Sequence, residues 1–189
     1  MGIKGSTMVE PLWQGLPPID PSALSNSASC ALAARYDAVK GAREFTRATL
    51  HGWDLTQLFD DVALVVSELV TNALRHALPG EDRESLGSRP QAGHGAGHGG
   101  GPMAVVEPAV RLHLMRWTSR LVCAVRDPSE VSPVTGDTAL FPELNGAAES
   151  GRGLYLVESF SDSWGWHPLA GTLRGKVVWA LFQLPRSEG

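Results

Sequence analysis

The chain has few cysteines and no long apolar run, and each of these absences excludes a class of protein. Cys30 and Cys123 are the only cysteines among 189 residues, and they are too far apart for a CxxC pair. A disulfide framework and a zinc site are therefore not implied, and Cys123 is interpreted as a small core residue. No apolar stretch approaches the roughly 20 residues of a membrane-spanning helix, and no signal peptide is visible. We therefore expect a cytoplasmic protein that does not contact membranes.

The chain also lacks a strong charge of either sign. Its 16 basic and 20 acidic residues give a net charge of −4 at pH 7. A nucleic-acid-binding surface needs a basic face, so we expect no direct contact with nucleic acid. The length suits a single domain with appendages, long enough to bury a sizeable core.

Composition divides the chain into a folded domain and three appendages. Residues 1–28 are rich in proline and small polar residues and are interpreted as a disordered leader. The domain is expected over residues 29–185, with a tail at 186–189. Residues 79–109 include a Gly/His-rich run that has too little apolar content to pack, which predicts a flexible surface insert. Without a fixed scaffold, its His94 and His98 are not expected to form a metal site.

The periodicity of apolar residues predicts an α+β fold. Asp37 and Thr56 are the expected N-caps of the first two helices. The expected elements are, in order, an edge strand at 29–35, helices at 37–51 and 56–78, strands at 110–117 and 121–127, a helix at 153–163, and strands at 164–167 and 176–184. This order predicts a mostly antiparallel sheet covered by helices on one face.

Three polar residues form a stripe on the second helix. Glu68, Asn72 and His76 recur every four residues, and each step of four turns about 40° around a helix. The apolar face beside them consists of Val62, Val65, Val66, Leu69, Val70, Ala73 and Ala77. Polar groups at the edge of a buried face need partners. The stripe is therefore either bonded to neighbouring backbone or part of a site.

Two further segments could carry chemistry. Asp127 ends a strand before Pro128 and is either a turn-former or a hydrogen-bond acceptor in a site. Gly151-Arg152-Gly153 precedes a helix, where backbone N–H groups and the helix dipole can meet a phosphate. The dinucleotide fingerprint is excluded because Leu156 replaces its third glycine, and the segment 171–177 does not match a P-loop.

Four segments together resemble the GHKL ATPase superfamily, and the match is closest to the anti-sigma-factor serine/threonine kinases and their actinobacterial relatives. They read SELVTNALRHA (67–77), RDPS (126–129), ESGRGLYLVESFSDSWGW (149–166) and GKVVWALF (175–182). The resemblance covers most of residues 29–185 apart from the insert. It implies the GHKL (Bergerat-type) α/β sandwich, with ATP and Mg²⁺ as cofactors.

The resemblance also implies roles for single residues. Asn72 would bind Mg²⁺, Glu68 would accept a proton from the attacking hydroxyl, and Asp127 would accept a hydrogen bond from the adenine amino group. His76 is either structural or part of the nucleotide site. The remaining nucleotide-binding positions implied are Gly151, Arg152, Gly153 and Leu154. The sequence departs from the wider family at Ser129 and Glu130, where glycine is preferred, and at Lys176-Val177, which lack the adenine-holding threonine of many relatives.

The function implied is that of a partner-switching kinase. It would phosphorylate a serine on a small antagonist protein and bind a sigma factor, and it would act either alone or as a homodimer. The alternative is a catalytically silent ATP-binding module that sequesters its partner. A histidine-kinase catalytic domain would need a dimerising helix pair, for which the leader is too short and proline-rich. A gyrase- or MutL-like ATPase would need a transducer domain after residue 185, which we do not expect here.

Overall fold

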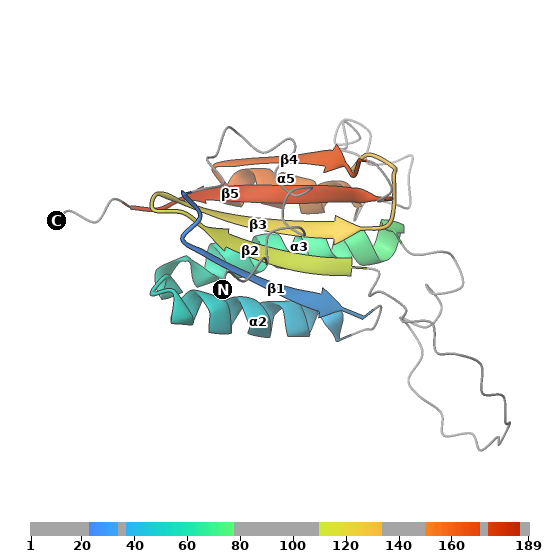
Figure 1. Ribbon diagram of the computed structural model, residues 1–189. Helices are drawn as coiled ribbons and strands as arrows, with labels where there is room; N and C mark the ends of the chain where they lie inside the picture. The colour runs from blue at the N-terminus through green and yellow to red at the C-terminus, as the bar shows by residue number, and fades with distance from the viewer. Residues whose placement is uncertain (1–22, 34–36, 78–109, 134–149, 171–173, 186–189) are drawn as a thin grey trace, which may run out of the picture.

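The computed structural model describes five stretches of the chain (Figure 1). They are residues 23–33, 37–77, 110–133, 150–170 and 174–185, with the side chains of 76, 77 and 150–152 left out. Most of the expected leader, the whole of the insert and the tail lie outside these residues, so those assignments remain predictions. Within the described residues, no helix combines the length and the apolar character needed to cross a membrane.

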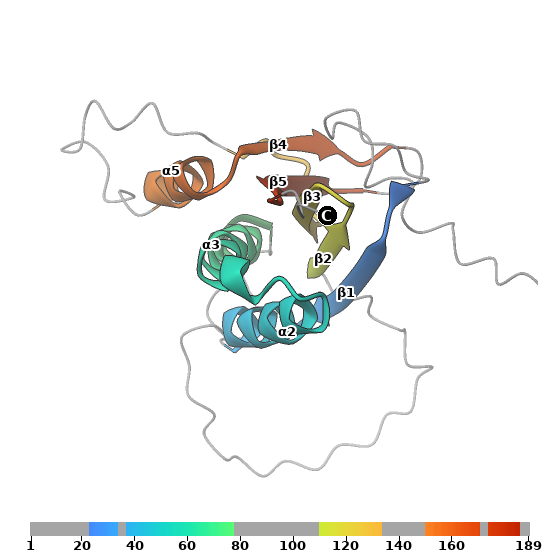
Figure 2. The same ribbon diagram turned by 90° about the vertical axis from the view of Figure 1, so that its left-hand side faces the viewer.

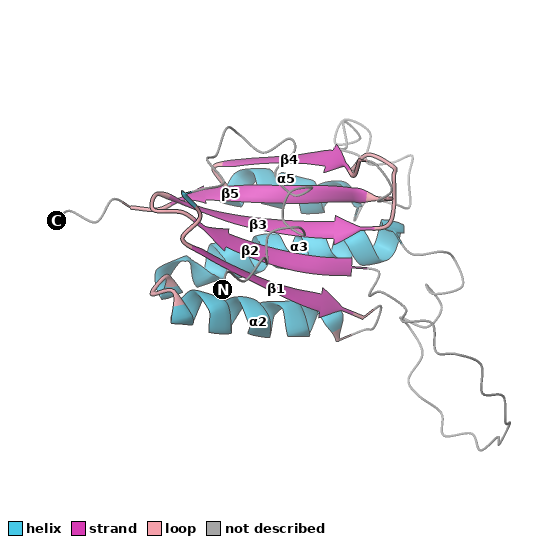
Figure 3. Cartoon of the chain, viewed as in Figure 1, coloured by secondary structure: helices cyan, strands magenta, loops and turns pink. Residues whose placement is uncertain are grey.

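In the part of the chain that the structure describes, five antiparallel strands form one sheet (Figure 3). Their order across the sheet is β1 (Asn26–Leu32), β2 (Val110–Arg116), β3 (Arg120–Asp127), β5 (Lys176–Gln183) and β4 (Ser163–Pro168). Strands β2 and β3 form the expected hairpin, and β5 lies between β3 and β4. The first strand is an edge strand, as its position in the sequence predicted.

Among the described residues, three helices cover one face of this sheet (Figure 2). They are α2 (Ala38–Gly52), α3 (Phe59–Ala77) and α5 (Ser150–Phe160), and a short 3₁₀ turn, η2 (Thr56–Leu58), leads into α3. The α+β fold expected from the periodicity and the sandwich implied by the resemblance are therefore confirmed.

Helix α3 is central because its apolar stripe packs into the core. Val62, Val65, Val66, Leu69 and Val70 are at most 2% exposed and belong to the cluster between helices and sheet. Each such side chain contributes about 1.5–3 kcal/mol when it is fully buried. The sheet contributes the alternate residues of its strands to this cluster, among them Leu112, Leu114, Cys123, Val125, Val178 and Ala180.

Cys123 has the structural role that its position predicted. It is fully buried, and burial raises the pKa of its thiol to about 12. Cys30, on the edge strand, is half-buried, and neither cysteine forms a disulfide. Both thiols are therefore packing groups in this structure.

Two N-terminal boundaries differ from the sequence predictions. Strand β1 begins at Asn26 and ends at Leu32, because it pairs with β2 along the whole length from Arg116 to Val110. Asp37 stands at the predicted cap position of α2, but its side chain makes no capping bond. The prediction that Thr56 caps the second helix is wrong, because Thr56 is itself the first residue of η2.

The third helix is also shifted along the sequence. Helix α5 begins at Ser150 and ends at Phe160, about three residues earlier at each end than predicted. Gly151, Arg152 and Gly153 thus lie inside its first turn rather than ahead of it. Ser163, predicted to end this helix, instead begins β4, where it pairs with Leu181.

Candidate functional site

The polar stripe of α3 faces the first turn of α5. Glu68 and Asn72 are half-buried, and both lie against Gly153. A β-carbon built on Gly153 would stand 2.8 Å from Glu68 Oε2, 3.3 Å from Asn72 Nδ2 and 3.5 Å from Asn72 Oδ1. Glu68 and Asn72 therefore meet Gly153, which lies more than 80 positions later in the sequence, where the two helices touch.

This contact gives Gly153 a structural role in addition to the predicted one. The sequence suggested that glycine lets the backbone approach a phosphate. In the structure, glycine also leaves the space that the Glu68 carboxylate and the Asn72 amide occupy. The first turn of α5 still carries backbone N–H groups that have no partner within the helix, which is the feature that attracts anions.

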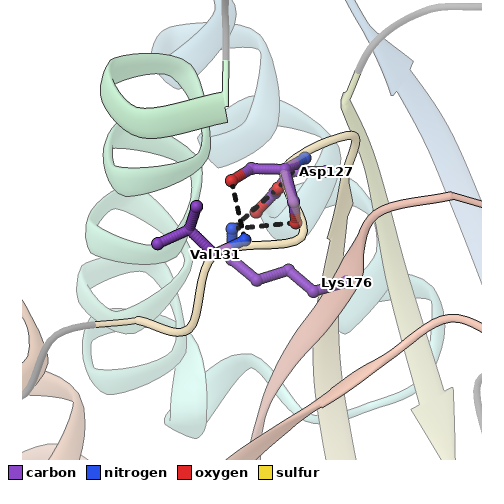
Figure 4. Close-up of polar contacts among 4 residues, drawn as sticks. Asp127, Val131 and Lys176 are labelled. Carbon is purple, nitrogen blue, oxygen red and sulfur yellow. Dashed lines mark hydrogen bonds and ion pairs between the residues drawn. The ribbon is translucent and has the colours of Figure 1, made fainter.

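A second polar group lies at the C-terminal end of β3 (Figure 4). Asp127 is the last residue of this strand and is paired in register with Lys176, the first residue of β5. The Lys176 Nζ donates to Asp127 Oδ1 at 2.9 Å, and the two side chains are only 6% and 2% exposed. The backbone N–H of Ser129 donates to the same oxygen at 2.8 Å. Asp127 is thus both a turn-former and half of a buried ion pair.

Gly175 allows the start of β5 to approach the end of β3 closely. It has a positive φ of 105°, and a β-carbon there would overlap the Asp127 carbonyl oxygen and stand 2.9 Å from Pro128 Cα. Residues other than glycine rarely adopt such a φ. The glycine therefore allows the start of β5 to lie directly against the end of β3.

Both groups border the same helix. Helix α3 packs against α5, β3 and β5, and Figure 1 shows the tip of β3 and the end of α3 on the same side of the molecule. The adenine-binding position on β3 and the proton-accepting position on α3, both implied by the resemblance, therefore lie on elements that pack against each other.

The other predicted residues are placed less fully. His76 lies in the last turn of α3, and Gly151 and Arg152 lie in the first turn of α5, but their side chains lie outside what the structure describes. Leu154 is 5% exposed, so it is a buried side chain on α5. The proposed roles of His76, Gly151 and Arg152 remain predictions.

Lys176 is the residue that sequence reasoning missed. It was noted as a departure from the threonine of many relatives, and its contact with Asp127 was not foreseen. The signal was a single charge at the start of the otherwise apolar run VVWALF. A lysine at that place needs an anionic partner if the strand is buried.

The residues present fit a nucleotide with a hard cation. Asn72 offers a neutral amide oxygen, while no group of three histidine, cysteine or acidic residues in the described part of the chain could hold a metal. Mg²⁺ commonly takes few protein ligands and binds through phosphates and water. Asn72 beside the N-terminal turn of α5 matches that pattern.

Comparison with known proteins identifies the family. Residues 32–181 match the sequence profile of the histidine kinase-like ATPase domain. The chain belongs to this family. Membership confirms the resemblance to the GHKL ATPases and implies a domain that binds ATP.

The comparison with solved structures also finds similar chains. The chain is similar to a chain in the crystal structure of the SiaB–SiaC complex from Pseudomonas aeruginosa, with a TM-score of 0.45 and 13% sequence identity. The match covers 85% of this chain and 90% of that chain. No curated protein sequence matches the chain.

Proposed function

We propose that this protein is an ATP-dependent serine/threonine kinase of the anti-sigma-factor type that regulates transcription by partner switching. The observation that carries the proposal is the meeting of Glu68, Asn72 and Gly153 in a member of an ATPase family. This arrangement places a carboxylate and an amide oxygen beside the helix N-terminus at which phosphates bind favourably.

The reaction assigned to the site is transfer of the γ-phosphoryl group of ATP to a serine hydroxyl. The hydroxyl oxygen forms a bond to the γ-phosphorus, the bond from that phosphorus to the bridging oxygen breaks, and ADP leaves. Glu68 accepts the hydroxyl proton, the task that an acidic residue performs in kinase catalytic loops. Asn72 would hold Mg²⁺, which would supply positive charge beside the phosphates. Asp127 accepts a hydrogen bond from the adenine amino group.

A protein substrate is supported by apolar side chains exposed beside these residues. Val131, four residues after Asp127, is 70% exposed, and Tyr155, two residues after Gly153, is 68% exposed. Exposed apolar side chains beside a binding site can add to contact with another protein, whereas isolated ones elsewhere on a surface need no explanation. The partners proposed are a small antagonist protein that carries the acceptor serine and a sigma factor.

A catalytically silent module that binds ATP and sequesters a partner is the second candidate. The departures at Ser129, Glu130 and Lys176 favour it, because they alter the surroundings of the adenine-binding acid. The carboxylate of Glu68 favours the kinase, because a module without phosphotransfer has no need of a base at that place.

Calorimetry and phosphotransfer together test the proposal. The full chain is titrated with ATP in the presence of Mg²⁺, and labelled phosphate transfer is then measured to a small antagonist protein encoded beside its gene. The kinase proposal expects saturable ATP binding and a labelled serine. ATP binding and tight partner binding without transfer would favour the silent module, and absence of ATP binding would contradict both candidates.

A further inference from the structure

The buried pair of Asp127 and Lys176 is held in place from several sides. Lys176 Nζ bonds Asp127 Oδ1 at 2.9 Å and the Ser129 carbonyl oxygen at 3.3 Å, and the Ser129 N–H bonds Asp127 Oδ1 at 2.8 Å (Figure 4). The tight backbone contact at Gly175 fixes the position of Lys176 opposite Asp127. The two charged groups therefore have little freedom to move apart.

Separating this pair would be unfavourable. Both side chains are at least 94% buried, and removing one partner of such a pair leaves a buried charge without compensation. A ligand that reaches Asp127 is therefore expected to meet the carboxylate and the ammonium together. It must supply a donor for the carboxylate and an acceptor for the ammonium.

The Lys176 ammonium can donate one further hydrogen bond. Its nitrogen carries three N–H groups, and two of them are accounted for by Asp127 Oδ1 and the Ser129 carbonyl oxygen. One edge of adenine carries a complementary pair, the exocyclic amino donor beside the N1 acceptor. A threonine, common at this place in relatives, would offer one neutral hydroxyl donor instead.

We propose that Lys176 is a specificity-determining residue that donates a hydrogen bond to N1 of adenine while Asp127 accepts one from the amino group. The inference rests on the proposed nucleotide binding and deepens it. Adenine would then be bound by two groups together, the Asp127 carboxylate as acceptor and the Lys176 ammonium as charged donor. A base without a nitrogen acceptor at position 1 would leave the Lys176 ammonium with an unmatched donor.

The test compares ATP with 1-deaza-ATP, in which a C–H group replaces N1. Binding of both to the full chain is measured by calorimetry with Mg²⁺. A hydrogen bond to a charged group corresponds to roughly ten- to a hundredfold in affinity, which is the expected preference of the unmodified protein for ATP. Lys176→Met, which keeps the apolar stem, is expected to bind both nucleotides with nearly equal affinity.

Arg174→Met is the matched control. Arg174 is two residues away, and its side chain is 86% exposed in a surface ion pair with Glu130 at 3.6 Å. Its loss removes one positive charge from the same segment and should leave the preference for ATP intact. Lys176→Thr, in which a neutral donor replaces the charged one, is a second variant in case the methionine variant does not fold, and its preference for ATP should be smaller than that of the unmodified protein.

The outcomes separate the inference from the function on which it rests. Equal binding of ATP and 1-deaza-ATP by the unmodified protein would overturn the role of Lys176 and leave ATP binding intact. Tighter ATP binding by Lys176→Met would also overturn it, because Lys176 would then compete with adenine. Failure of the unmodified protein to bind ATP would remove the proposed function, and this inference with it.

Discussion

Gly153 lies so close to Glu68 that a β-carbon on the glycine would stand 2.8 Å from the carboxylate oxygen Oε2. That distance is shorter than a van der Waals contact, so a larger residue at 153 must displace the Glu68 side chain. The carboxylate is the far end of a flexible side chain, which can move at little energetic cost. The position of the proposed base therefore depends on the absence of a side chain on the neighbouring helix.

Gly153→Ala is expected to reduce phosphotransfer much more than stability. Alanine improves helix propensity by about 1 kcal/mol, which offsets the cost of moving Glu68. A misplacement of about 1 Å can lower turnover by roughly 10²-fold. Turnover and thermal unfolding are measured on the same sample. Gly41→Ala, at a helix glycine with nothing within 4 Å, is the control and should leave turnover unchanged. A large loss of stability in Gly153→Ala with normal turnover in the folded fraction would contradict this expectation.

Glu68→Gln and Asn72→Ala should have different kinetic effects. Glutamine keeps the size of Glu68 but cannot accept a proton, so turnover should fall by about 10²–10⁴-fold while ATP affinity changes little. Alanine at position 72 removes a proposed ligand of Mg²⁺, so Mg²⁺-dependent binding and turnover should weaken together. Calorimetry and labelled phosphate transfer measure the two quantities. Unchanged turnover in Glu68→Gln would show that another group accepts the proton.

His113 on β2 should make the fold less stable in mild acid. Burial and the positive charges of Arg111 and Arg126 lower its pKa from 6.5 to about 4. The unfolded chain therefore binds a proton that the folded protein does not, so stability is complete above pH 6.5 and decreases as the pH falls towards 4. The full effect of this shift is on the order of 3 kcal/mol.

Urea unfolding at pH 7.5 and pH 5 measures this effect. In His113→Gln, the loss of stability between the two pH values should be smaller than in the unmodified protein. His51→Gln, at an exposed histidine in the last turn of α2, is the matched substitution and should retain the loss. An identical loss in His113→Gln and in the unmodified protein would assign the pH dependence to other groups.

Gly175→Ala should destabilise the domain. Alanine would adopt an unfavourable positive φ and overlap the Asp127 carbonyl oxygen, so the start of β5 must move. Backbone strain of this kind costs on the order of 1–3 kcal/mol. Gly52→Ala is the comparison, because nothing lies within 4 Å of a β-carbon there. Equal stability of the two variants in urea unfolding would show that β5 can shift without cost.

The sequence was sufficient to predict the fold because its apolar periodicity is strong. Residues such as Val62, Val65 and Leu69 on α3 mark one buried face without ambiguity, and the alternating residues of β2 and β3 do the same. Element boundaries were less certain, because they depend on pairing partners. The start of β1 at Asn26 is set by the length of β2, which lies more than 80 residues away in sequence.

The site was predicted in part for the same reason. Glu68 and Asn72 could be recognised from a local motif, and Asp127 from its place at a strand end. The contacts of Gly153 and Lys176 could not be foreseen, because each depends on a residue of another element. In the sequence, Lys176 was noted only because many relatives have a threonine there. The structure shows that its ammonium is buried and paired with Asp127.

Helix α5 packs against fewer of the described elements than α3 does. It packs chiefly against α3 and makes a small contact with β4, whereas α3 packs against α2, α5 and three strands. Segments with fewer packing contacts open more often, so amide hydrogens of α5 should exchange with solvent faster than those of α3. A ligand that joins the first turn of α5 to Asn72 would slow that exchange. Hydrogen exchange with and without nucleotide would therefore report how firmly the bound phosphates fasten this helix to the rest of the domain.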